Sequence, residues 1–234
     1  MKKTKIICTI GPSTNTKEKI KALINAGMDC ARFNFSHGTH ESQKAMMDLV
    51  KAARREAGRS IAILLDTKGP EVRVKLFEHG FAILKDGQKF VLDNEDTLGN
   101  EQRVGITYNE LYKNVKKGTH ILVDDGAIEL KVCSIVDDKI ITTVVHGGKI
   151  SNRKSINVPN NPLPMKYLSE QDKKDILFGI KQDVDFIAAS FVRTAQDVKD
   201  LREFLNANGG QSIEIISKIE NTQGVKNFKQ ILNY

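Results

Sequence analysis

The two ends of the sequence alternate between short apolar runs and amphipathic runs, and this alternation constrains the fold more than any other feature. Over residues 1–69 the apolar runs are TKIICTIG, DCARFNFS and SIAILLDT, and an amphipathic run follows each of the first two. The rhythm resumes over residues 160–234, where the apolar runs are VDFIAASF and SIEIISKIE. A strand followed by a helix, several times over, predicts an α/β fold with parallel strands covered by helices.

The amphipathic runs carry signals for helix starts and ends. In NTKEKIKALINAG, Asn15 is the expected N-cap and Gly27 the expected end. Ser169 is the expected N-cap of the helix SEQDKKDILFGIKQ. The other expected helices are THESQKAMMDLVKAARREAG, TAQDVKDLREFLNANGG and, as a single last helix, NTQGVKNFKQILN.

Residues 70–159 have a different character, because short β-rich runs replace the helical pattern. These runs are FAILK, QKFVL, HILVD, AIELKVCSI and KIITTVV, and turn signals such as Asp86-Gly87 separate them. The spacing predicts a small all-β barrel or sandwich, inserted between the third strand and the helix that follows it. The proline-rich VPNNPLP is the expected return linker.

The predicted domains are therefore 1–69, the β insert 70–159, and the continuation 160–234. The α/β part supplies five strands, whereas a (β/α)8 barrel needs eight strands and roughly 250 residues. Two alternatives remain: either the sheet is open, or the chain is part of a barrel. In both, the first and fifth strands would lie at sheet edges.

Composition narrows the class of protein. The net charge of +7 comes from 36 Lys and Arg against 29 Asp and Glu, spread along the chain with no Trp. A nucleic-acid protein would show a basic stripe with interleaved aromatic residues, whereas anionic small molecules suit a mild basic excess equally well. Three cysteines without a CxxC motif argue against a disulfide framework or a zinc site. The sequence has no membrane-length apolar run and no signal-peptide pattern, so we expect a cytoplasmic protein with no nucleic-acid or membrane partner.

The end of the second apolar run gives the sharpest local signal. In CARFNFSHG, Phe33 and Phe35 fall on one face of a strand and Arg32, Asn34 and Ser36 on the other. Three polar side chains on the inner face of a sheet are costly in a dry core, but they form a ligand site at the carboxyl edge of a barrel. The alternative is a solvated strand end.

The third and fifth apolar runs end in charged or oxygen-bearing side chains. Asp66 and Thr67 follow SIAILL, and their oxygens, with those of Asn34 and Ser36, suit a hard cation. Asp66 is equally well explained as an acidic turn or cap residue. In SKIEN, Lys218 and Glu220 lie two residues apart on one face, where Glu220 suits a divalent metal and Lys218 suits charge on a transferring phosphoryl group. A structural ion pair is the alternative.

Five motifs, in order and around a β-rich insert, resemble pyruvate kinase: KIICTIGPST, ARFNFSHG, LLDTKGPEVR, NVP and SKIEN. The resemblance covers essentially the whole chain. It implies a partial (β/α)8 TIM-type barrel with an inserted all-β lid domain. It also implies transfer of the phosphoryl group of phosphoenolpyruvate to ADP, with Mg²⁺ or Mn²⁺ and K⁺ as cofactors.

The resemblance also implies residue roles. Arg32 would contact the phosphate of phosphoenolpyruvate, and Lys218 would stabilise charge in the transition state. Glu220 would bind Mg²⁺, and the K⁺ ligands would be Asn34, Ser36, Asp66 and Thr67. The expected nucleotide contacts are Asn34, His37, Arg73 and Lys154. Glu71 resembles the residue of K⁺-dependent members.

The family pattern continues beyond Tyr234, into strands that supply a second Mg²⁺-binding aspartate and a phosphate-contacting threonine. We therefore expect this chain to be the N-terminal portion of such an enzyme, poorly active by itself, whose longer form is a homo-oligomer, a tetramer by resemblance. Two rival hypotheses are a non-catalytic nucleotide-binding fragment and a Mg²⁺-dependent enolate-forming barrel lyase. A nucleic-acid binder is the weakest alternative.

Overall fold

The computed structural model describes residues 3–159, 161 and 163–234, and it divides into two compact units. Unit 1 comprises Met1–Pro70 and Lys166–Tyr234, and unit 2 comprises Glu71–Met165. The second boundary thus lies beyond the predicted Pro159. Residues 160 and 162 of the expected linker lie outside the described residues.

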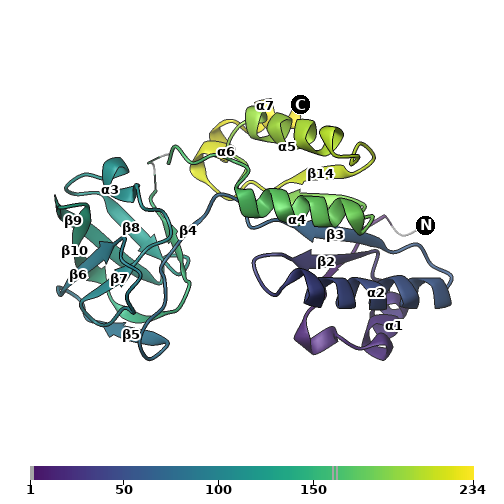
Figure 1. Ribbon diagram of the computed structural model, residues 1–234, viewed down its shortest axis with the longest axis horizontal. Helices are drawn as coiled ribbons and strands as arrows, with labels where there is room; N and C mark the ends of the chain where they lie inside the picture. Colours follow the sequence, from purple (N-terminus) through teal and green to yellow (C-terminus); the bar gives the residue numbers. More distant parts are fainter. Residues whose placement is uncertain (1–2, 160, 162) are drawn as a thin grey trace. The chain divides into compact units, whose positions relative to one another are not determined.

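Unit 1 contains one parallel sheet of five strands in the order β1-β2-β3-β13-β14 (Figure 1). Its strands are β1 (Ile7–Thr9), β2 (Cys30–Asn34), β3 (Ala62–Asp66), β13 (Phe186–Ala189) and β14 (Glu214–Ser217). Its longer helices are α1 (Lys17–Ala26), α2 (His40–Glu56), α4 (Glu170–Lys181) and α5 (Ala195–Ala207). The α/β fold predicted for a partial barrel is confirmed, with β1 and β14 at the sheet edges.

The helix termini follow local chemistry. Thr39, Ser169 and Thr194 are the N-caps of α2, α4 and α5, each in a reciprocal capping box. The prediction for Ser169 is confirmed, but the N-cap of α1 is Thr16, not Asn15. Asn15 instead ends the short 3-10 helix Pro12–Thr14, which delays the start of α1.

The predicted single last helix is wrong, because it is two short helices. These are α6 (Thr222–Lys226) and α7 (Phe228–Leu232), and Asn227 lies between them with ψ near 7°. The Asn227 side chain donates to the carbonyl of Arg193 at 2.9 Å. This bond to the loop before α5 competes with continued helix, as Asn side chains commonly do.

The two faces of the sheet in unit 1 differ in character. One face packs against the helices through residues such as Phe33, Leu65 and Ile187, all fully buried. On the opposite face, Cys30, Leu64 and Ala188 form a small apolar cluster. In β2 the opposite face then becomes polar toward the carboxyl end, because side chains alternate along a strand.

Unit 2 is rich in β structure and has its own apolar core, which includes Phe90, Leu92 and Ile121. A seven-stranded sheet has the order β4-β12-β8-β9-β10-β6-β7, and β11 pairs separately with β5. The strands are β4 (Val72–Arg73), β5 (Phe81–Leu84), β6 (Lys89–Asp93), β7 (Arg103–Gly105), β8 (His120–Val123), β9 (Ile128–Val136), β10 (Lys139–His146), β11 (Gly148–Ser151) and β12 (Ser155–Asn157). A short helix, α3 (Leu111–Asn114), precedes β8.

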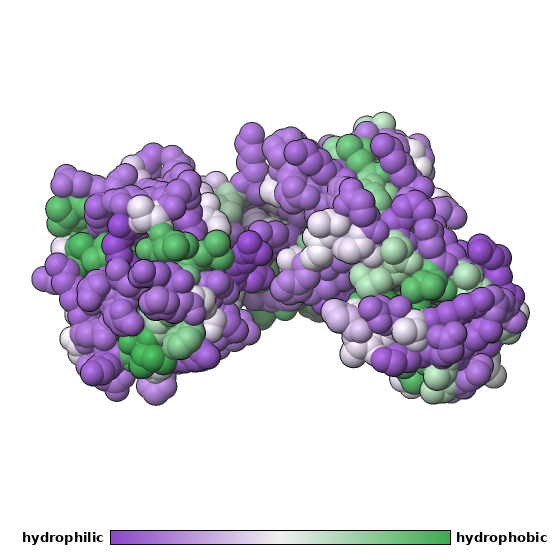
Figure 2. Space-filling model, turned by 60° about the horizontal axis from the view of Figure 1, so that its bottom comes forward, coloured by the Kyte–Doolittle hydropathy of each residue, from purple (hydrophilic) through white to green (hydrophobic). Residues whose placement is uncertain are grey.

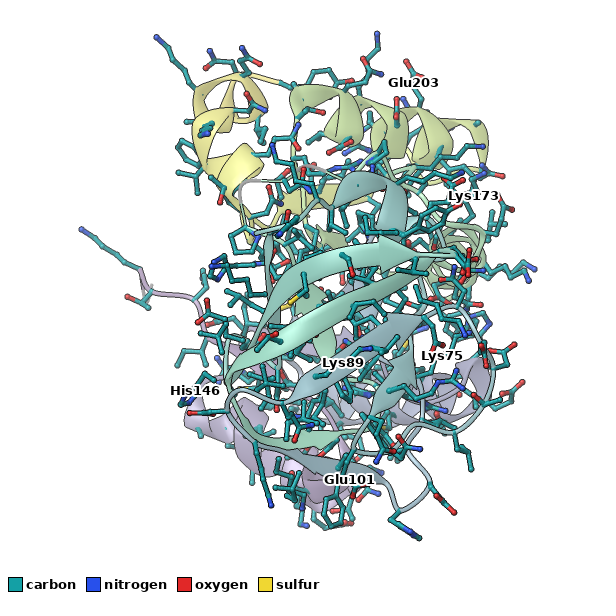
Figure 3. All side chains as sticks on the ribbon, turned by 90° about the vertical axis from the view of Figure 1, so that its left-hand side faces the viewer. Lys75, Lys89, Glu101, His146, Lys173 and Glu203 are labelled. Carbon is teal, nitrogen blue, oxygen red and sulfur yellow. The ribbon has the colours of Figure 1, made fainter. Side chains whose placement is uncertain are left out.

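The surface in Figure 2 is largely hydrophilic, with hydrophobic patches between the hydrophilic regions. On unit 2, the charged side chains of Lys89 and Glu101 lie on the outside (Figure 3). Among the described residues, no helix combines the length and the apolar character needed to cross a membrane.

Candidate active site

Asp66, the last residue of β3, joins two cationic side chains at the carboxyl edge of the sheet in unit 1. Its Oδ2 accepts from Arg32 Nε at 2.6 Å and from Nη2 at 2.5 Å. Its Oδ1 accepts from Lys218 Nζ at 3.0 Å. The Asp66 side chain is 2% exposed, whereas those of Arg32 and Lys218 are 31% and 29% exposed. Two cations are therefore held over one buried carboxylate while both remain accessible to a solute.

Lys218 and Glu220 also meet, with Nζ and Oε1 separated by 3.3 Å. The predicted strand is shorter than expected, since β14 ends at Ser217 and both residues lie in the segment after it. Lys218 and Glu220 nevertheless lie on the side opposite to Ile213 and Ile219, which pack on the core between the sheet and the helices. A chain of charges thus runs from Arg32 through Asp66 and Lys218 to Glu220.

Asn34, the last residue of β2, lies beside Asp66, and a loop follows it. The two residues are register partners in the parallel pairing of β2 with β3, which places them on the same face of the sheet. Asn34 Oδ1 accepts from the Ser36 backbone N–H at 2.9 Å, a local turn typical of Asn. His37 follows and is exposed.

Gln43, buried on α2, holds the loop between Asn34 and His37 through two hydrogen bonds. Its Nε2 donates to the carbonyl of Asn34 at 3.0 Å and to that of His37 at 2.9 Å. Gln43 could not be identified from the sequence, because a polar residue in the first turn of a helix is usually solvated. Its burial depends on how α2 packs under the loop.

Thr67 is buried, and its hydroxyl joins β3 to β13. The Oγ1 atom donates to the carbonyl of Ala188 at 3.3 Å and accepts from the Ser190 N–H at 3.1 Å. The carbonyl of Thr67 accepts from Ser190 Oγ at 2.7 Å. The Thr67 hydroxyl therefore has a structural function between two strands, whatever else it contacts.

The donor atoms at this edge suit hard cations. In the described part of the chain, no group of three or more His, Cys, Asp and Glu side chains is arranged to hold a metal ion. A cation here would need amide, hydroxyl and carbonyl oxygens beside a carboxylate, which is an all-oxygen set. Asn34, Ser36, Asp66 and Thr67 supply such a set, and carboxylate oxygens can accept more than one contact each.

Arg73 and Lys154 belong to unit 2, where they form a second group. Ser155, which follows Lys154, pairs with Arg73 across β12 and β4. The Arg73 guanidinium donates to both oxygens of Glu71 and, at 2.6 Å, to the carbonyl of Arg153. Lys154 Nζ lies 2.9 Å from Asp124 Oδ1. Each of the two cations is thus held by a carboxylate on its own unit.

Ser190 and Phe191, directly after β13, were missed by the sequence analysis. Ser190 Oγ accepts from Lys218 Nζ at 2.8 Å, and the Phe191 N–H donates to Glu220 Oε2 at 3.0 Å. Their position was an available signal, since VDFIAA is an apolar strand and Ser190 follows its carboxyl end. Both residues were expected to be part of that strand, VDFIAASF.

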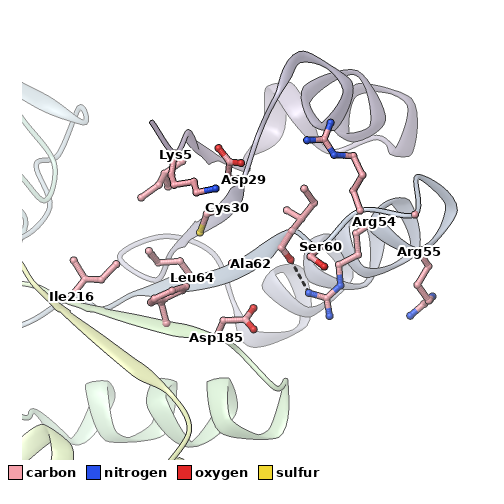
Figure 4. A pocket seen from close by; sticks show the side chains of 15 residues that line it. Lys5, Asp29, Cys30, Arg54, Arg55, Ser60, Ala62, Leu64, Asp185 and Ile216 are labelled. Atoms are coloured by element: carbon pink, nitrogen blue, oxygen red, sulfur yellow. Dashed lines mark hydrogen bonds between the residues drawn. The ribbon is translucent and has the colours of Figure 1, made fainter. Parts of the chain in front are cut away.

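A hollow lies at the amino ends of the strands in unit 1 and is shown in Figure 4. Its volume is about 850 Å³, and basic Arg54 and Arg59 line it together with acidic Asp185. Arg54 donates to the carbonyl of Ile61 at 2.8 Å, so it supports the fold. Burial, with Asp185 nearby, raises the pKa of Cys30 in this hollow to about 11, so its thiol is protonated near neutral pH. The lining of this hollow carries charges of both signs, as the carboxyl edge does.

Comparison with known proteins agrees with the geometry. A family model described as "Pyruvate kinase, barrel domain" matches residues 1–234. The chain is 46% identical over 233 residues to a pyruvate kinase of Clostridium perfringens, covering 99% of this chain and 49% of that relative. It is also 46% identical to one of Geobacillus stearothermophilus and 44% identical to one of Sporosarcina psychrophila, covering 99% and 100% of this chain and 40% of each relative. The chain spans between two fifths and a half of these relatives, and it belongs to the pyruvate kinase family.

Proposed function

We propose that this chain carries part of an active site that transfers the phosphoryl group of phosphoenolpyruvate to ADP, giving pyruvate and ATP. The observation that supports this most is the carboxylate of Asp66, which holds Arg32 and Lys218 side by side at the strand ends. Both cations keep nearly a third of their side-chain surface accessible, so an anion can approach them. Phosphoryl transfer requires mainly positioning and charge stabilisation, which such a pair supplies.

The two cations have different roles in this proposal. Arg32 contacts the phosphate of phosphoenolpyruvate, because a guanidinium fork matches phosphate oxygens in geometry. Lys218 is the catalytic residue that stabilises charge on the transferring group and on the enolate oxygen that it leaves. Asp66 positions both side chains, because one of its oxygens accepts from Arg32 and the other accepts from Lys218.

The metal ions of the proposed reaction fit the same edge of the sheet. Glu220 would hold Mg²⁺ or Mn²⁺, and Asn34, Ser36, Asp66 and Thr67 would hold K⁺. When bound, these ions supply positive charge to the oxygens of the two phosphorylated substrates. Glu220 is already held by the Phe191 N–H, so its carboxylate has a fixed place from which to do so.

The nucleotide contacts are assigned to both units. In unit 1, Asn34 and His37 would contact the nucleotide. In unit 2, Arg73 and Lys154 would contact the phosphates of ADP. Unit 2 then acts as a lid whose closure excludes water and strengthens each charged contact. From its membership of the pyruvate kinase family, we also infer that the protein is cytoplasmic and that its longer form is a homo-oligomer.

A chimaera tests the proposal, because this chain spans 49% of the Clostridium perfringens relative. We expect little pyruvate formation from the 234-residue chain alone. We expect Mg²⁺- and K⁺-dependent pyruvate formation when the chain replaces the matching segment of that relative. Lys218→Met should lower kcat of the chimaera by about 10²–10³, the usual loss for one transition-state contact. Lys44→Met on the exposed face of α2 is the control and should leave kcat unchanged.

Three outcomes would contradict the proposal. A folded chimaera without activity would exclude this chain from the reaction, and equal turnover by Lys218→Met would remove the role given to Lys218. Normal turnover by the isolated chain would contradict its incompleteness.

A further inference from the structure

Ser190 lies between the charged groups of the candidate site without carrying a charge. It is 2% exposed and comes directly after β13. Its Oγ accepts from Lys218 Nζ at 2.8 Å and lies 2.7 Å from the Thr67 carbonyl and 3.0 Å from Asp66 Oδ1. A hydroxyl has one proton to donate and two lone pairs, so it donates to one of these oxygens while it accepts from the ammonium.

We propose that Ser190 is a positioning residue, which holds the Lys218 ammonium in place through its hydroxyl; this rests on the catalytic role proposed for Lys218. The ammonium has three protons, and three acceptors surround it: Ser190 Oγ at 2.8 Å, Asp66 Oδ1 at 3.0 Å and Glu220 Oε1 at 3.3 Å. The contact with Glu220 is the longest and the easiest to exchange for a substrate oxygen. Ser190 then keeps the ammonium located without neutralising its charge.

The backbone around Ser190 is fixed from several sides. Its N–H donates to Thr67 Oγ1 at 3.1 Å, and its carbonyl accepts from the Tyr167 hydroxyl at 3.1 Å. Burial and the nearby Asp197 raise the pKa of Tyr167, so its hydroxyl remains a donor over the neutral range. The position of Ser190 is therefore set by Thr67 after β3 and by the segment before α4, together with backbone bonds of Lys218 to Ala189 and Val192.

The next residue adds a second observation. Phe191 has a φ of +56°, in the left-handed region that bulky side chains rarely adopt. Such a conformation persists where surrounding contacts fix it, and its N–H donates to Glu220 Oε2 at 3.0 Å. The dipeptide Ser190-Phe191 thus contacts the proposed catalytic lysine with one residue and the proposed metal ligand with the other.

The test measures proton exchange at the lysine ammonium in the full 234-residue chain by ¹H–¹⁵N NMR. Ammonium groups held by several hydrogen bonds exchange slowly with water, and the signal that disappears in Lys218→Arg is assigned to Lys218. Ser190→Ala should speed this exchange about fivefold, the equivalent of one hydrogen bond. Ser190→Cys, whose sulfur is a weak acceptor, should act in the same direction if the alanine variant does not fold.

Ser169→Ala is the matched control. It removes the N-cap of α4, so it lowers stability without touching Lys218, and the exchange rate of Lys218 should not change. An unprotected Lys218 signal in the unsubstituted chain, or equal exchange in a folded Ser190 variant, would overturn the proposal. A titration with phosphoenolpyruvate in the same samples separates the two hypotheses. One result would reject the proposed function and leave the contact between Ser190 and Lys218 in place. In that result, Ser190 controls proton exchange at Lys218, but neither the chain nor its active-site variants respond to phosphoenolpyruvate.

Discussion

At the scale of single residues, Asp66 is the side chain on which the candidate site depends. It is almost completely buried, yet it contacts two cations and the Ser190 hydroxyl. A carboxylate in such a place is stable in its charged form only because these partners replace the water that it has lost. Removing its charge would leave Arg32 and Lys218 close together without their shared counter-ion.

Asp66→Asn should therefore lower the free energy of unfolding by about 3 kcal/mol, as expected when one member of a buried ion pair is removed. Urea unfolding followed by circular dichroism measures the change. Asp48→Asn is the control, because the pair of Asp48 with Lys44 is half-exposed and should contribute less than about 1 kcal/mol. Equal effects of the two substitutions would show that Asp66 does not organise this edge.

The sequence allowed some of these residues to be predicted but not others. Lys218 and Glu220 could be paired because charged residues two apart at a strand end share a side, and that rule needs no tertiary information. Ser190 could not be assigned, because one hydroxyl after an apolar run is common. Its contact with Lys218 spans 28 positions and depends on the pairing of β13 with β14.

At the scale of elements, amphipathic runs predicted the longer helices, and a competing side-chain bond explains the break in the last one. Ser169 begins α4 as expected, since its hydroxyl accepts from the Asp172 N–H at 3.0 Å. The break at Asn227 was not predictable, because it depends on a bond to Arg193 in a distant loop. Strands of two or three residues, such as β4, are too short to show a periodic pattern.

The contact between α1 and α2 makes stability depend on acid pH. Lys17 and Lys21 of α1 both bind Glu56 of α2 and lower its pKa to about 2. Because the pKa of Glu56 in the folded chain lies below its ordinary value of 4.5, this contribution to stability is present above pH 4.5 and is lost as the pH falls toward 2. Glu56→Gln should reduce the decrease in unfolding midpoint between pH 5 and pH 2.5. An unchanged acid dependence in a thermal melt would contradict this.

The turn that follows β3 depends on a glycine. Gly69 has a φ of +71°, and a Cβ at this position would lie 2.8 Å from the Ser190 carbonyl oxygen. Gly69→Ala should therefore destabilise unit 1 by about 1–3 kcal/mol, through backbone strain and contact together. Gly58→Ala is the matched control, because its φ is +60° and no heavy atom lies within 4 Å. Chemical unfolding should show a smaller loss for Gly58→Ala, and an equal loss would remove the contribution of the contact.

At the scale of the whole molecule, two compact units with separate cores are built from one chain whose β-rich part is inserted into the α/β part. The alternation of apolar and amphipathic runs was sufficient to predict the parallel α/β sheet of unit 1. The parallel register of β2, β3 and β13 then brings strand ends from distant parts of the sequence to one edge. The central claim for function is that the substrate binds at that edge and not in the hollow at the opposite end of the strands.

The most direct test is calorimetric titration of the chain with phosphoenolpyruvate in the presence of Mg²⁺ and K⁺. Arg32→Leu removes a cation from the carboxyl edge, and Arg55→Leu removes one from the hollow at the amino ends. We predict that the chain binds phosphoenolpyruvate, that Arg32→Leu weakens binding at least about tenfold, and that Arg55→Leu leaves it unchanged. Absence of binding, or a loss in Arg55→Leu that equals the loss in Arg32→Leu, would contradict the account.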